Sequence, residues 1–514
     1  MSFSRVFSAQ TELLSGVIVS VEIDITHKVL NNFTIVGLGD RAVDEARDRV
    51  GSALKNSGFE SPKTKNQKTV VSLSPADLKK EGSHFDLSIA LGFLIAEGLE
   101  TENIDHALFV GELSLDGRVQ SIKGMLPIAR SAKFSGFTEL YVPKENADEA
   151  ALVEGIRVIP LETLSQCIEH LRKEHPQKIL PYVREKKESA SHRPHTDFGD
   201  IVGQESAKRG LMIAAAGGHN IIMHGPPGTG KTMLARALAG ILPALESEVA
   251  MEVASIHSIA GKKITPESLH IPPFRSPHHT SSYVSIIGGG SFPKPGEVTL
   301  AHRGVLFLDE FPEFDRRVVE SLRQPLEEHF VTIARAKGSA VFPAQFLFVS
   351  AMNPCPCGFR NSKKKFCTCT AADLVRYKRK LSGPLLDRID IALHVSEVSY
   401  EKLSGDRSAP ESHGVRERVE RARARAFART RALGLPEKKN GELSAKEIGK
   451  VVKLTEDVEK ILREAAERLV LSGRAYHRVQ KLARTIADLD ESDEIKPEHI
   501  LEAISYRPQL ETLT

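Results

Sequence analysis

The chain has 514 residues, of which 41% are hydrophobic and 27% charged, a length and composition typical of a protein with several packed domains. Its 70 Lys and Arg residues nearly balance its 67 Asp and Glu residues, and the formal charge of +3 excludes whole-chain charge as a source of nucleic-acid binding. No apolar run reaches the roughly 18 residues that a membrane helix needs, and the first residues do not resemble a signal peptide. The sequence therefore predicts a cytoplasmic protein without a membrane partner.

Residues 1–175 predict an α+β domain. The expected strands are β-branched runs at 15–25, 68–74, 139–143 and 156–161, and the expected helices cover 44–58, 86–98 and 147–155. Residues 176–199 lose this periodicity and gain Pro, Ser and charge. This change of composition predicts a linker.

Two segments of the first domain, VSLSPADLKKEGSHFDLSIALGFLIAEG and GELSLDGRVQSIKGMLPIARSAKFSG, resemble the proteolytic domain of Lon, which has the ribosomal S5 domain 2-like fold. Lon uses a Ser nucleophile that a Lys activates. His84 stands at the serine position of this resemblance, and Leu126 stands at the lysine position. A Ser-Lys dyad needs both groups within hydrogen-bond reach. The resemblance therefore implies a Lon-protease-like domain that is catalytically inactive, although Ser83 and Lys123 lie nearby in the sequence.

Residues 200–398 predict an α/β domain, and residues 399–514 predict a helical lid. Apolar runs of strand length alternate with helical segments in the first of these, at 220–225, 253–259, 305–310, 346–353 and 391–398. This alternation is typical of a mostly parallel sheet with helices on both faces. The last 116 residues, 399–514, are almost entirely helical in period and rich in Arg, Glu and Ala.

The octamer GPPGTGKT matches the phosphate-binding loop G-x-x-x-x-G-K-[ST], with Gly225, Gly230, Lys231 and Thr232 at its fixed positions. Glycines let backbone N–H groups surround the phosphates, Lys231 reaches the β and γ oxygens, and the Thr232 hydroxyl binds Mg²⁺. A strand-like run precedes the octamer and a helical run follows it, which is the context that the motif requires. The sequence therefore predicts a nucleoside triphosphate site.

Two further segments predict the groups for hydrolysis. GVLFLDEF ends an apolar run with Asp309, the second candidate ligand of Mg²⁺, and Glu310, the candidate base for water. FLFVSAMNP ends with Asn353, which we expect to sense the γ-phosphate or the attacking water, because the carboxyl edge of a parallel sheet faces the nucleotide. Alone, an Asp-Glu pair indicates a solvated turn; the phosphate-binding loop favours the catalytic interpretation.

Together these elements resemble the AAA+ ATPases, P-loop NTPases that bind ATP. DIVGQESAKRG resembles the entry motif of that family, so Ile201, Val202 and Gly203 are expected to line the adenine pocket. The resemblance extends the ATP-binding set to the whole loop and the start of the next helix: Gly225, Pro226, Pro227, Gly228, Thr229, Gly230, Lys231, Thr232 and Met233.

Two arginines complete the resemblance. GPLLDRIDI resembles the segment of the arginine finger, which implies that Arg388 reaches the γ-phosphate held by a neighbouring subunit; an ion pair with Asp387 or Asp390 is the simpler alternative. LSGRAYHRVQKLARTIADL resembles the second sensor of the lid, with Arg474 as its best match and Arg478 as the alternative. Because a neighbour must supply the finger, the resemblance implies a homo-hexamer.

The long interval between Thr232 and Asp309 contains PFRSPHHTSSYVSIIGGGSFPKPGEVTLAHRG, which is too rich in Gly and Pro for a plain helix-strand pair. Residues 328–347 predict a hairpin with Arg335 and Lys337 near its tip. Both features resemble the magnesium-chelatase and replicative-helicase branch of AAA+ proteins, in which an insert and a hairpin project into the pore of the ring. FRSPHHT, IGGG, PKPGEVTLAHRGVLFLDEFPEF and AMNPCPCG resemble the bacterial ComM (YifB) family, and the match covers nearly the whole chain.

The resemblance to this family implies an ATP-dependent hexameric DNA translocase, or helicase, that promotes branch migration in DNA recombination and natural transformation. The implied partners are single-stranded and branched DNA, recombinase or competence proteins, and other copies of the chain. A protein-remodelling ATPase of the chelatase type is the first alternative. An ATP-dependent peptidase is the second, and His84 and Leu126 disfavour it. Only seven Tyr and no Trp predict that contacts with the DNA backbone dominate over base stacking.

Four of the five cysteines crowd into residues 355–369. They form two C-x-C pairs separated by nine residues: Cys355, Cys357, Cys367 and Cys369. Four thiolates fit a closed tetrahedral site for structural Zn²⁺. Free thiols or redox disulfides are the alternatives, because C-x-C is tighter than the usual C-x-x-C.

Basic residues supply the candidate DNA contacts. Three of them lie inside the cysteine loop and two in the predicted hairpin: Lys363, Lys364, Lys365, Arg335 and Lys337. Lys and Arg near a stapled loop can bind phosphates without reading sequence. A solvated lysine run is the alternative for the loop.

Overall fold

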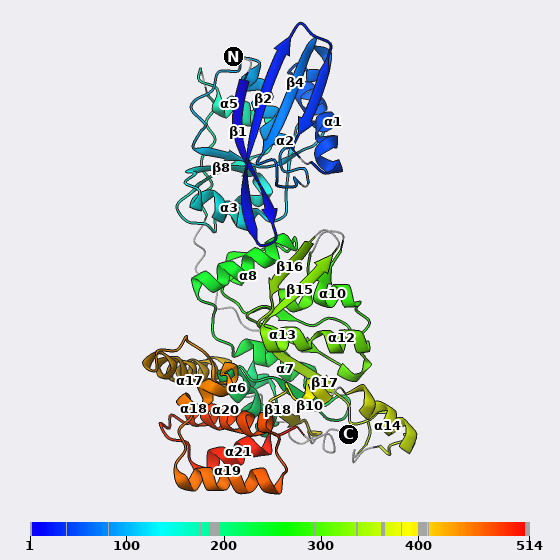
Figure 1. The fold of residues 1–514 in the computed structure, drawn as a ribbon, viewed down its shortest axis with the longest axis vertical. Helices are drawn as coiled ribbons and strands as arrows, with labels where there is room; N and C mark the ends of the chain where they lie inside the picture. Colours follow the sequence, from blue (N-terminus) through cyan, green and yellow to red (C-terminus); the bar gives the residue numbers. More distant parts are fainter. Residues whose placement is uncertain are drawn as a thin grey trace. The chain divides into compact units, whose positions relative to one another are not determined.

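The structure is a computed structural model of the chain (Figure 1). It describes residues 3–37, 39–80, 82–174, 176–184, 196–290, 294–335, 338–360, 365–381, 383–398, 409 and 411–508. Its internal contacts divide the chain into two compact units. The first contains residues 1–190 and 250–269, and the second contains residues 191–249 and 270–514.

The first unit is built on a mixed sheet with the strand order β3-β4-β2-β1-β5-β8-β9. Alternate residues of β2 and β4 are buried, because one face of these strands packs against the core. The strands are β1 (Phe3–Glu12), β2 (Ser15–His27), β3 (Asn32–Val36), β4 (Gln67–Ser74), β5 (Ala107–Phe109), β6 (Glu112–Leu113), β7 (Val119–Gln120), β8 (Glu139–Pro143) and β9 (Arg157–Leu161). The helices are α1 (Arg41–Asn56), α2 (Asp86–Ala96), α3 (Met125–Phe134), α4 (Ala147–Ala150), α5 (Leu164–Leu171) and, from the inserted segment, α8 (Ser247–Ile259) and α9 (Pro266–Leu269). The predicted mixture of strands and helices is confirmed.

Residues 250–269 fall within the predicted ATPase domain in the sequence but pack with the first unit. The run 253–259, predicted as a strand, belongs to helix α8, so that prediction was wrong. Ala254 and Ile264 lie in one apolar cluster with Leu126 of α3. A short apolar run does not distinguish a strand from a helix, and only the packing partner decides between them.

The positions that the Lon resemblance marks have other partners in this unit. Leu126 is buried, and its N–H lies 3.4 Å from the Ser258 hydroxyl oxygen, which accepts. The Ser83 hydroxyl donates to Glu112. A Ser-Lys dyad would require that hydroxyl to bond a lysine amine. Absence of peptidase activity therefore stays a prediction, and these contacts support it.

A buried ion pair joins α1 to α2. Arg49 donates from Nε and Nη2 to the two carboxylate oxygens of Asp86 at 2.7 and 3.0 Å, and the Leu113 N–H donates to the same carboxylate at 3.2 Å. The Asp86 side chain is fully buried. Burial raises the pKa of Asp86 to about 6 despite these donors. The ionised carboxylate therefore depends on Arg49.

Replacing Arg49 by Ala is expected to lower the free energy of unfolding of the first unit by about 3 kcal/mol, because a buried charge loses its partner. Hydrogen exchange, measured by mass spectrometry over α1 and α2, reports this loss. Arg47→Ala, with an exposed side chain beside Asp48, is the matched control and should change the value by less than about 0.5 kcal/mol. At pH 5 the Asp86 carboxyl is largely protonated, so the loss in free energy of unfolding caused by Arg49→Ala should be smaller. Equal exchange in the two variants at pH 8 would contradict the prediction.

Within the described residues, the second unit contains a parallel sheet of five strands in the order β11-β14-β17-β10-β18. Every residue of β10, β14 and β17 is buried, so both faces of the sheet are covered. The strands are β10 (Ile221–His224), β11 (Phe274–Arg275), β14 (Val305–Leu308), β17 (Leu347–Met352) and β18 (Ile391–His394), with β12 (Gly288–Gly289) and β13 (Lys294–Pro295) as a separate pair. The predicted parallel α/β fold is confirmed.

The predicted hairpin is confirmed as β15 (Phe330–Arg335) paired with β16 (Gly338–Pro343). Arg335 ends the first strand and stands opposite Gly338. Lys337 lies outside the described residues. The register thus places Arg335 next to the turn of the hairpin, as the sequence indicated.

Helices make up the described part of the C-terminal region, as predicted for the lid. The helices of the second unit before this region are α6 (Glu205–Gly217), α7 (Lys231–Gly240), α10 (Tyr283–Ile287), α11 (Glu297–Leu300), α12 (Arg316–Ser321), α13 (Arg323–Glu328), α14 (Ala371–Lys380) and α15 (Gly383–Leu386). Those of the lid are α17 (Ser412–Ala432), α18 (Ala445–Val451), α19 (Glu456–Arg468), α20 (Gly473–Leu489) and α21 (Pro497–Ser505). α17 and α20 pack against α6. None of the helices in the described ranges is both long enough and apolar enough to cross a membrane.

Candidate nucleotide site

The loop at 225–230 joins the end of β10 to the start of α7, as its motif predicts. Gly225 admits no side chain, since a Cβ there would lie 2.1 Å from the carbonyl oxygen of Val395. Gly228 and Gly230 have φ angles of +76° and +88°, which L side chains rarely adopt. Apart from the adjoining residues of the loop itself, no heavy atom of the described chain lies within 4 Å of the positions that their Cβ atoms would take. The loop therefore leaves open space along its backbone, which fits a phosphate chain.

Lys231 is the first residue of α7, and its side chain is buried. Its Nζ donates to the carbonyl oxygens of Gly225 and Pro226 at 2.7 and 2.8 Å and to Oδ1 of Asn353 at 3.1 Å. Burial lowers the pKa of Lys231 to about 8, against the opposing charge of Asp309. An ammonium group held by neutral oxygens beside an open loop fits an anionic ligand. Lys231 and Asn353 are thus brought together.

Thr232 and Asp309, the two predicted Mg²⁺ ligands, are also brought together. The Thr232 Oγ1 donates to Oδ2 of Asp309 at 2.7 Å. Thr232 lies in the first turn of α7, and Asp309 follows β14, so the pair forms at the carboxyl edge of the parallel sheet. A hydroxyl and a carboxylate are oxygen ligands of the kind that Mg²⁺ takes beside substrate phosphates. The donor set therefore fits Mg²⁺ at the predicted place.

Glu310 follows Asp309 and turns the chain with a φ of 50°. Its Oε2 lies 3.1 Å from Nδ1 of His279. His279 comes shortly after β11, the strand that pairs with β14, so it reaches the same edge of the sheet. No motif in the sequence pointed to a role for His279. The only available signal was its place after a strand that neighbours β14, and the sequence does not show which strands are neighbours.

The predicted adenine-pocket segment lies close to the phosphate-binding loop. Ile201, Val202 and Gly203 stand between the short helix η3 (Phe198–Asp200) and α6. A Cβ on Gly203 would lie 3.9 Å from Cγ1 of Val398. Because Gly225 borders Val395, the segment and the loop both flank the residues that follow β18. The other predicted ATP contacts lie in the loop or in α7: Pro226, Pro227, Thr229 and Met233.

Arg388 lies at the opposite edge of the sheet. Its carbonyl oxygen accepts a hydrogen bond from Nδ2 of Asn220 at 2.9 Å, and Asn220 directly precedes β10. Since β10 and β18 are parallel, both residues mark the amino edge of the sheet. The Arg388 side chain is only 13% exposed, and its guanidinium pairs with Glu327 of α13 rather than with Asp387 or Asp390, the partners that the sequence offered.

Arg474 lies near Arg388. Its Nη2 is 3.6 Å from Oε1 of Glu327, the same carboxylate that Arg388 contacts. The alternative candidate, Arg478, donates to the carbonyl oxygen of Asp387 at 2.6 Å. The two predicted arginines thus gather at one edge, and the groups for phosphate and metal gather at the other. Sequence patterns give no signal for Glu327, which is one of several charged residues on a polar helix.

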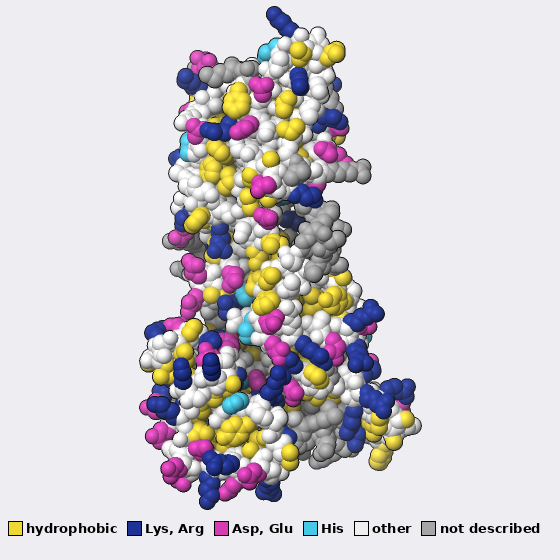
Figure 2. All heavy atoms as spheres, in the orientation of Figure 1, with side chains coloured by type: hydrophobic (Ala, Val, Ile, Leu, Met, Phe, Trp, Pro, Cys, Tyr) yellow, Lys and Arg dark blue, Asp and Glu magenta, His cyan; other side chains and the backbone are white. Residues whose placement is uncertain are grey.

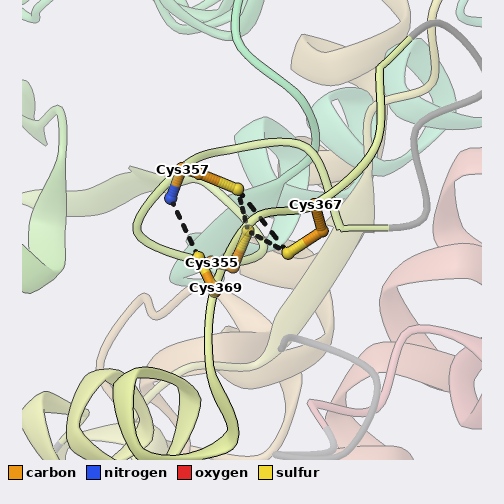
Figure 3. Close-up of side chains that lie close together, drawn as sticks. All are labelled: Cys355, Cys357, Cys367 and Cys369. Atoms are coloured by element: carbon orange, nitrogen blue, oxygen red, sulfur yellow. Dashed lines mark hydrogen bonds between the residues drawn. The ribbon is translucent and has the colours of Figure 1, made fainter.

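The four clustered cysteines converge. Their sulfur atoms all lie within 4.8 Å of one another (Figure 3): Cys355, Cys357, Cys367 and Cys369. The backbone N–H of Phe359 lowers the pKa of Cys357 to about 6. This arrangement is compatible with a structural Zn²⁺ ion. Lys365 holds its ammonium group 5.1 Å from the centre of the Phe359 ring, and Lys363 and Lys364 lie outside the described residues.

Family models cover most of the chain. The family described as magnesium chelatase, subunit ChlI, matches residues 197–403; a further ChlI model matches residues 21–146, and the model of the ChlI C-terminal region matches residues 409–507. Magnesium-chelatase-like AAA+ proteins are ATPases that use ATP and Mg²⁺, in agreement with the geometry above.

Two of the curated relatives match over nearly their full length. The chain is 40% identical over 520 residues to competence protein ComM of Haemophilus influenzae, covering 100% of this chain and 99% of that protein. It is 40% identical over 514 residues to YifB of Escherichia coli, covering 99% and 97%. A magnesium-chelatase 67 kDa subunit of Chlorobaculum parvum is 28% identical over 161 residues, covering 30% and 23%. The chain therefore belongs to the ComM/YifB family of magnesium-chelatase-like AAA+ ATPases.

Proposed function

We propose that this chain is an ATP-driven motor that assembles as a hexameric ring, translocates on DNA and promotes branch migration in recombination and natural transformation. The observation that carries the proposal is the separation of Arg388 from the phosphate-binding loop. The loop leaves the carboxyl edge of β10, while Arg388 lies at the amino edge beside Asn220. Arg388 can therefore serve an ATP site only if that site belongs to another copy of the chain. Closed rings are the usual result of such head-to-tail contacts.

The roles of the chain's own groups follow from their positions. Lys231 and the amides of the loop bind the phosphates, Thr232 and Asp309 hold Mg²⁺, and Glu310 orients water. The bound metal supplies charge neutralisation for the γ-phosphate. Asn353 holds the Lys231 ammonium at 3.1 Å and is therefore placed to respond to the phosphate that Lys231 binds.

A surface around the cysteine loop supports DNA as the substrate on which the proposed motor moves. The last turn of α14 carries Lys378, Arg379 and Lys380, and Figure 2 shows Lys and Arg side chains gathered over this helix at the lower right. Phe366 of the loop is 97% exposed. Basic groups and an exposed aromatic ring in one segment of the chain are typical of surfaces that bind single strands. The name of the Haemophilus relative, a competence protein, points to the same substrate.

Replacing Phe366 by Ala is expected to weaken binding of single-stranded DNA about tenfold, because one base loses its stacking partner. The rate of ATP hydrolysis without DNA should stay unchanged. Fluorescence anisotropy with a labelled oligonucleotide measures the affinity. Phe134→Ala is the matched control, since Phe134 is 95% exposed in the first unit. If both variants bind DNA as the unchanged protein does, this loop is not a DNA contact.

The affinity for ATP is expected to fall about tenfold when the pH rises from 7 to 9. With a pKa of about 8, Lys231 is mostly charged at pH 7 and mostly neutral at pH 9, and the charged form binds the phosphates. Titration of a fluorescent ATP analogue at saturating Mg²⁺ keeps the charge of the nucleotide constant. Lys231→Ala should bind weakly and equally at both pH values. An affinity that does not change with pH in the unchanged protein would contradict the prediction.

One experiment tests the function as a whole. ATP hydrolysis is measured without DNA, with single-stranded DNA and with three- and four-stranded junctions, and labelled casein is added to the same reactions. The proposal expects faster hydrolysis with DNA, unwound junctions and intact casein. Lys231→Ala should neither hydrolyse ATP nor unwind junctions, and casein should stay intact in its reactions too. A protein-remodelling ATPase of the chelatase type is the second candidate, favoured by the partial match to a magnesium-chelatase subunit. It predicts a hydrolysis rate that is indifferent to every DNA, and that result overturns the motor.

A further inference from the structure

The cysteine cluster has the dimensions of a metal site. The Sγ atom of Cys355 lies 3.4 Å from that of Cys357 and 3.7 Å from that of Cys367, and the last two are 3.6 Å apart (Figure 3). A tetrahedron with Zn–S bonds of about 2.3 Å has edges of about 3.8 Å. Cys369 completes the set within 4.8 Å. Four sulfur atoms at this spacing enclose the volume of one tetrahedral ion.

Backbone donors support the sulfur atoms. The N–H of Arg360 donates to Sγ of Cys355 at 3.3 Å, and the N–H of Cys357 donates to Sγ of Cys369 at 3.4 Å. Such bonds stabilise thiolates, which are the form that binds metal. A disulfide would use the sulfur atoms in pairs, whereas here each of the three close sulfur atoms has two sulfur neighbours. The chemistry of this set favours a soft divalent ion of tetrahedral preference.

The upstream end of the cysteine loop belongs to the nucleotide site. Asn353 follows β17, holds the Lys231 ammonium at 3.1 Å and stands two residues before Cys355. Gly358, inside the loop, packs on the phosphate-binding loop: a Cβ there would lie 2.9 Å from Cδ of Pro227. The cysteine loop therefore borders the predicted phosphate-binding loop.

The downstream end returns to the same place. α14 begins directly after Cys369 and Thr370, and its Tyr377 is buried. The Tyr377 hydroxyl donates to the backbone oxygen of Asn353 at 2.9 Å. Lys380, one turn further on, reaches the Glu313 carboxylate at 2.8 Å, and Glu313 follows Glu310 in the chain. An ion that joins the four sulfur atoms would close the loop and thereby hold α14 against Asn353.

We infer that Cys355, Cys357, Cys367 and Cys369 bind one Zn²⁺ ion, and that this ion, through Tyr377, positions Asn353 for ATP hydrolysis. Each thiol that is still protonated releases its proton as it binds the ion. The zinc centre is a positioning device and does not touch the nucleotide. Loss of the ion frees the start of α14, and Asn353 then loses the hydrogen bond that holds its backbone. ATP still binds through the phosphate-binding loop, but hydrolysis slows.

The first measurement is the metal content of the full-length protein, purified without chelators and without a metal-binding tag. Elemental mass spectrometry should find one zinc per chain. The double variant Cys367→Ser, Cys369→Ser should lose it, and Cys167→Ala, which removes the buried cysteine of the first unit, should keep it. Cobalt in place of zinc should give the visible absorption of a tetrahedral thiolate site. A protein without zinc, or with iron in its place, overturns the inference.

The second measurement separates binding from turnover in the absence of DNA. The double serine variant should hydrolyse ATP at least about tenfold more slowly at saturating ATP, while its affinity for ATP changes less than about threefold. Tyr377→Phe should keep its zinc and show the same loss of kcat. Tyr506→Phe, which removes a similarly buried hydroxyl from the lid, is the matched control and should retain full turnover.

Each outcome of these two measurements either supports or overturns the inference. Zinc lost with kcat unchanged overturns the coupling. If the double serine variant also loses ATP binding, Tyr377→Phe carries the test, and an unchanged kcat in that variant overturns the coupling as well. Because no DNA is present in these reactions, the result is independent of the proposed DNA motor.

Discussion

Replacing Glu310 by Gln is expected to slow ATP hydrolysis about 10³-fold and to leave ATP binding intact. Glu310 stands at the carboxyl edge of β14, beside the phosphate-binding loop, and its side chain is half-exposed. A Gln of the same shape keeps the contacts of the backbone but accepts no proton from water. The variant should therefore accumulate with ATP bound. In the structure this carboxylate lies 3.1 Å from Nδ1 of His279.

Two measurements are needed to check this prediction, one of the hydrolysis rate and one of the affinity for ATP. Single-turnover hydrolysis measures the chemical step, and the fluorescent analogue measures binding. Glu320→Gln is the matched control, because Glu320 lies on α12 and pairs with Arg323 at 2.6 Å, away from the phosphate-binding loop. It should hydrolyse ATP within about twofold of the unchanged protein. If Glu310→Gln keeps a comparable rate, another group orients the water and the assignment of Glu310 fails.

The arrangement of the groups expected to bind phosphate could be predicted because the sequence encodes them locally. A glycine-rich turn between a strand and a helix fixes Gly225, Lys231 and Thr232 within one stretch of chain, and its backbone demands little from elsewhere. Asp309 and Asn353 lie far away in sequence, but each ends an apolar run. In a parallel sheet such ends meet at one edge. The hydrogen bonds Thr232 to Asp309 and Lys231 to Asn353 follow from that rule.

Other features depend on contacts that no local pattern encodes. His279 reaches Glu310 only because β11 lies next to β14, and Glu327 meets Arg388 only because α13 crosses the amino edge of the sheet. The run 253–259 became a helix because α3 of the first unit offers it an apolar partner. Strand or helix in a short apolar run depends on such partners, which lie more than a hundred residues away in the chain.

Replacing Arg388 by Ala is expected to lower ATP hydrolysis by about 10³-fold or more, with ATP binding retained. Arg388 is 13% exposed and paired with Glu327, and its backbone lies beside Asn220 at the edge opposite to Lys231. The proposed function therefore expects its guanidinium to stabilise charge on a γ-phosphate across a boundary between subunits. Arg388→Lys should be nearly as slow, because an ammonium lacks the planar fork that binds two phosphate oxygens. Arg468→Ala, on the exposed surface of the lid, serves as the control and should be unaffected.

Mixing two inactive variants then decides where the arginine acts. Subunits with Lys231→Ala retain Arg388, and subunits with Arg388→Ala retain the phosphate-binding loop. In random rings of equal parts, about one interface in four joins an intact loop to an intact arginine, so the mixture should recover up to about a quarter of the normal rate. If the arginine served the ATP of its own chain, every subunit in the mixture would be inactive. A mixture that stays inactive although rings form would show that Arg388 does not act on the ATP of a neighbouring subunit. The physical basis for a ring-shaped motor would then be lost.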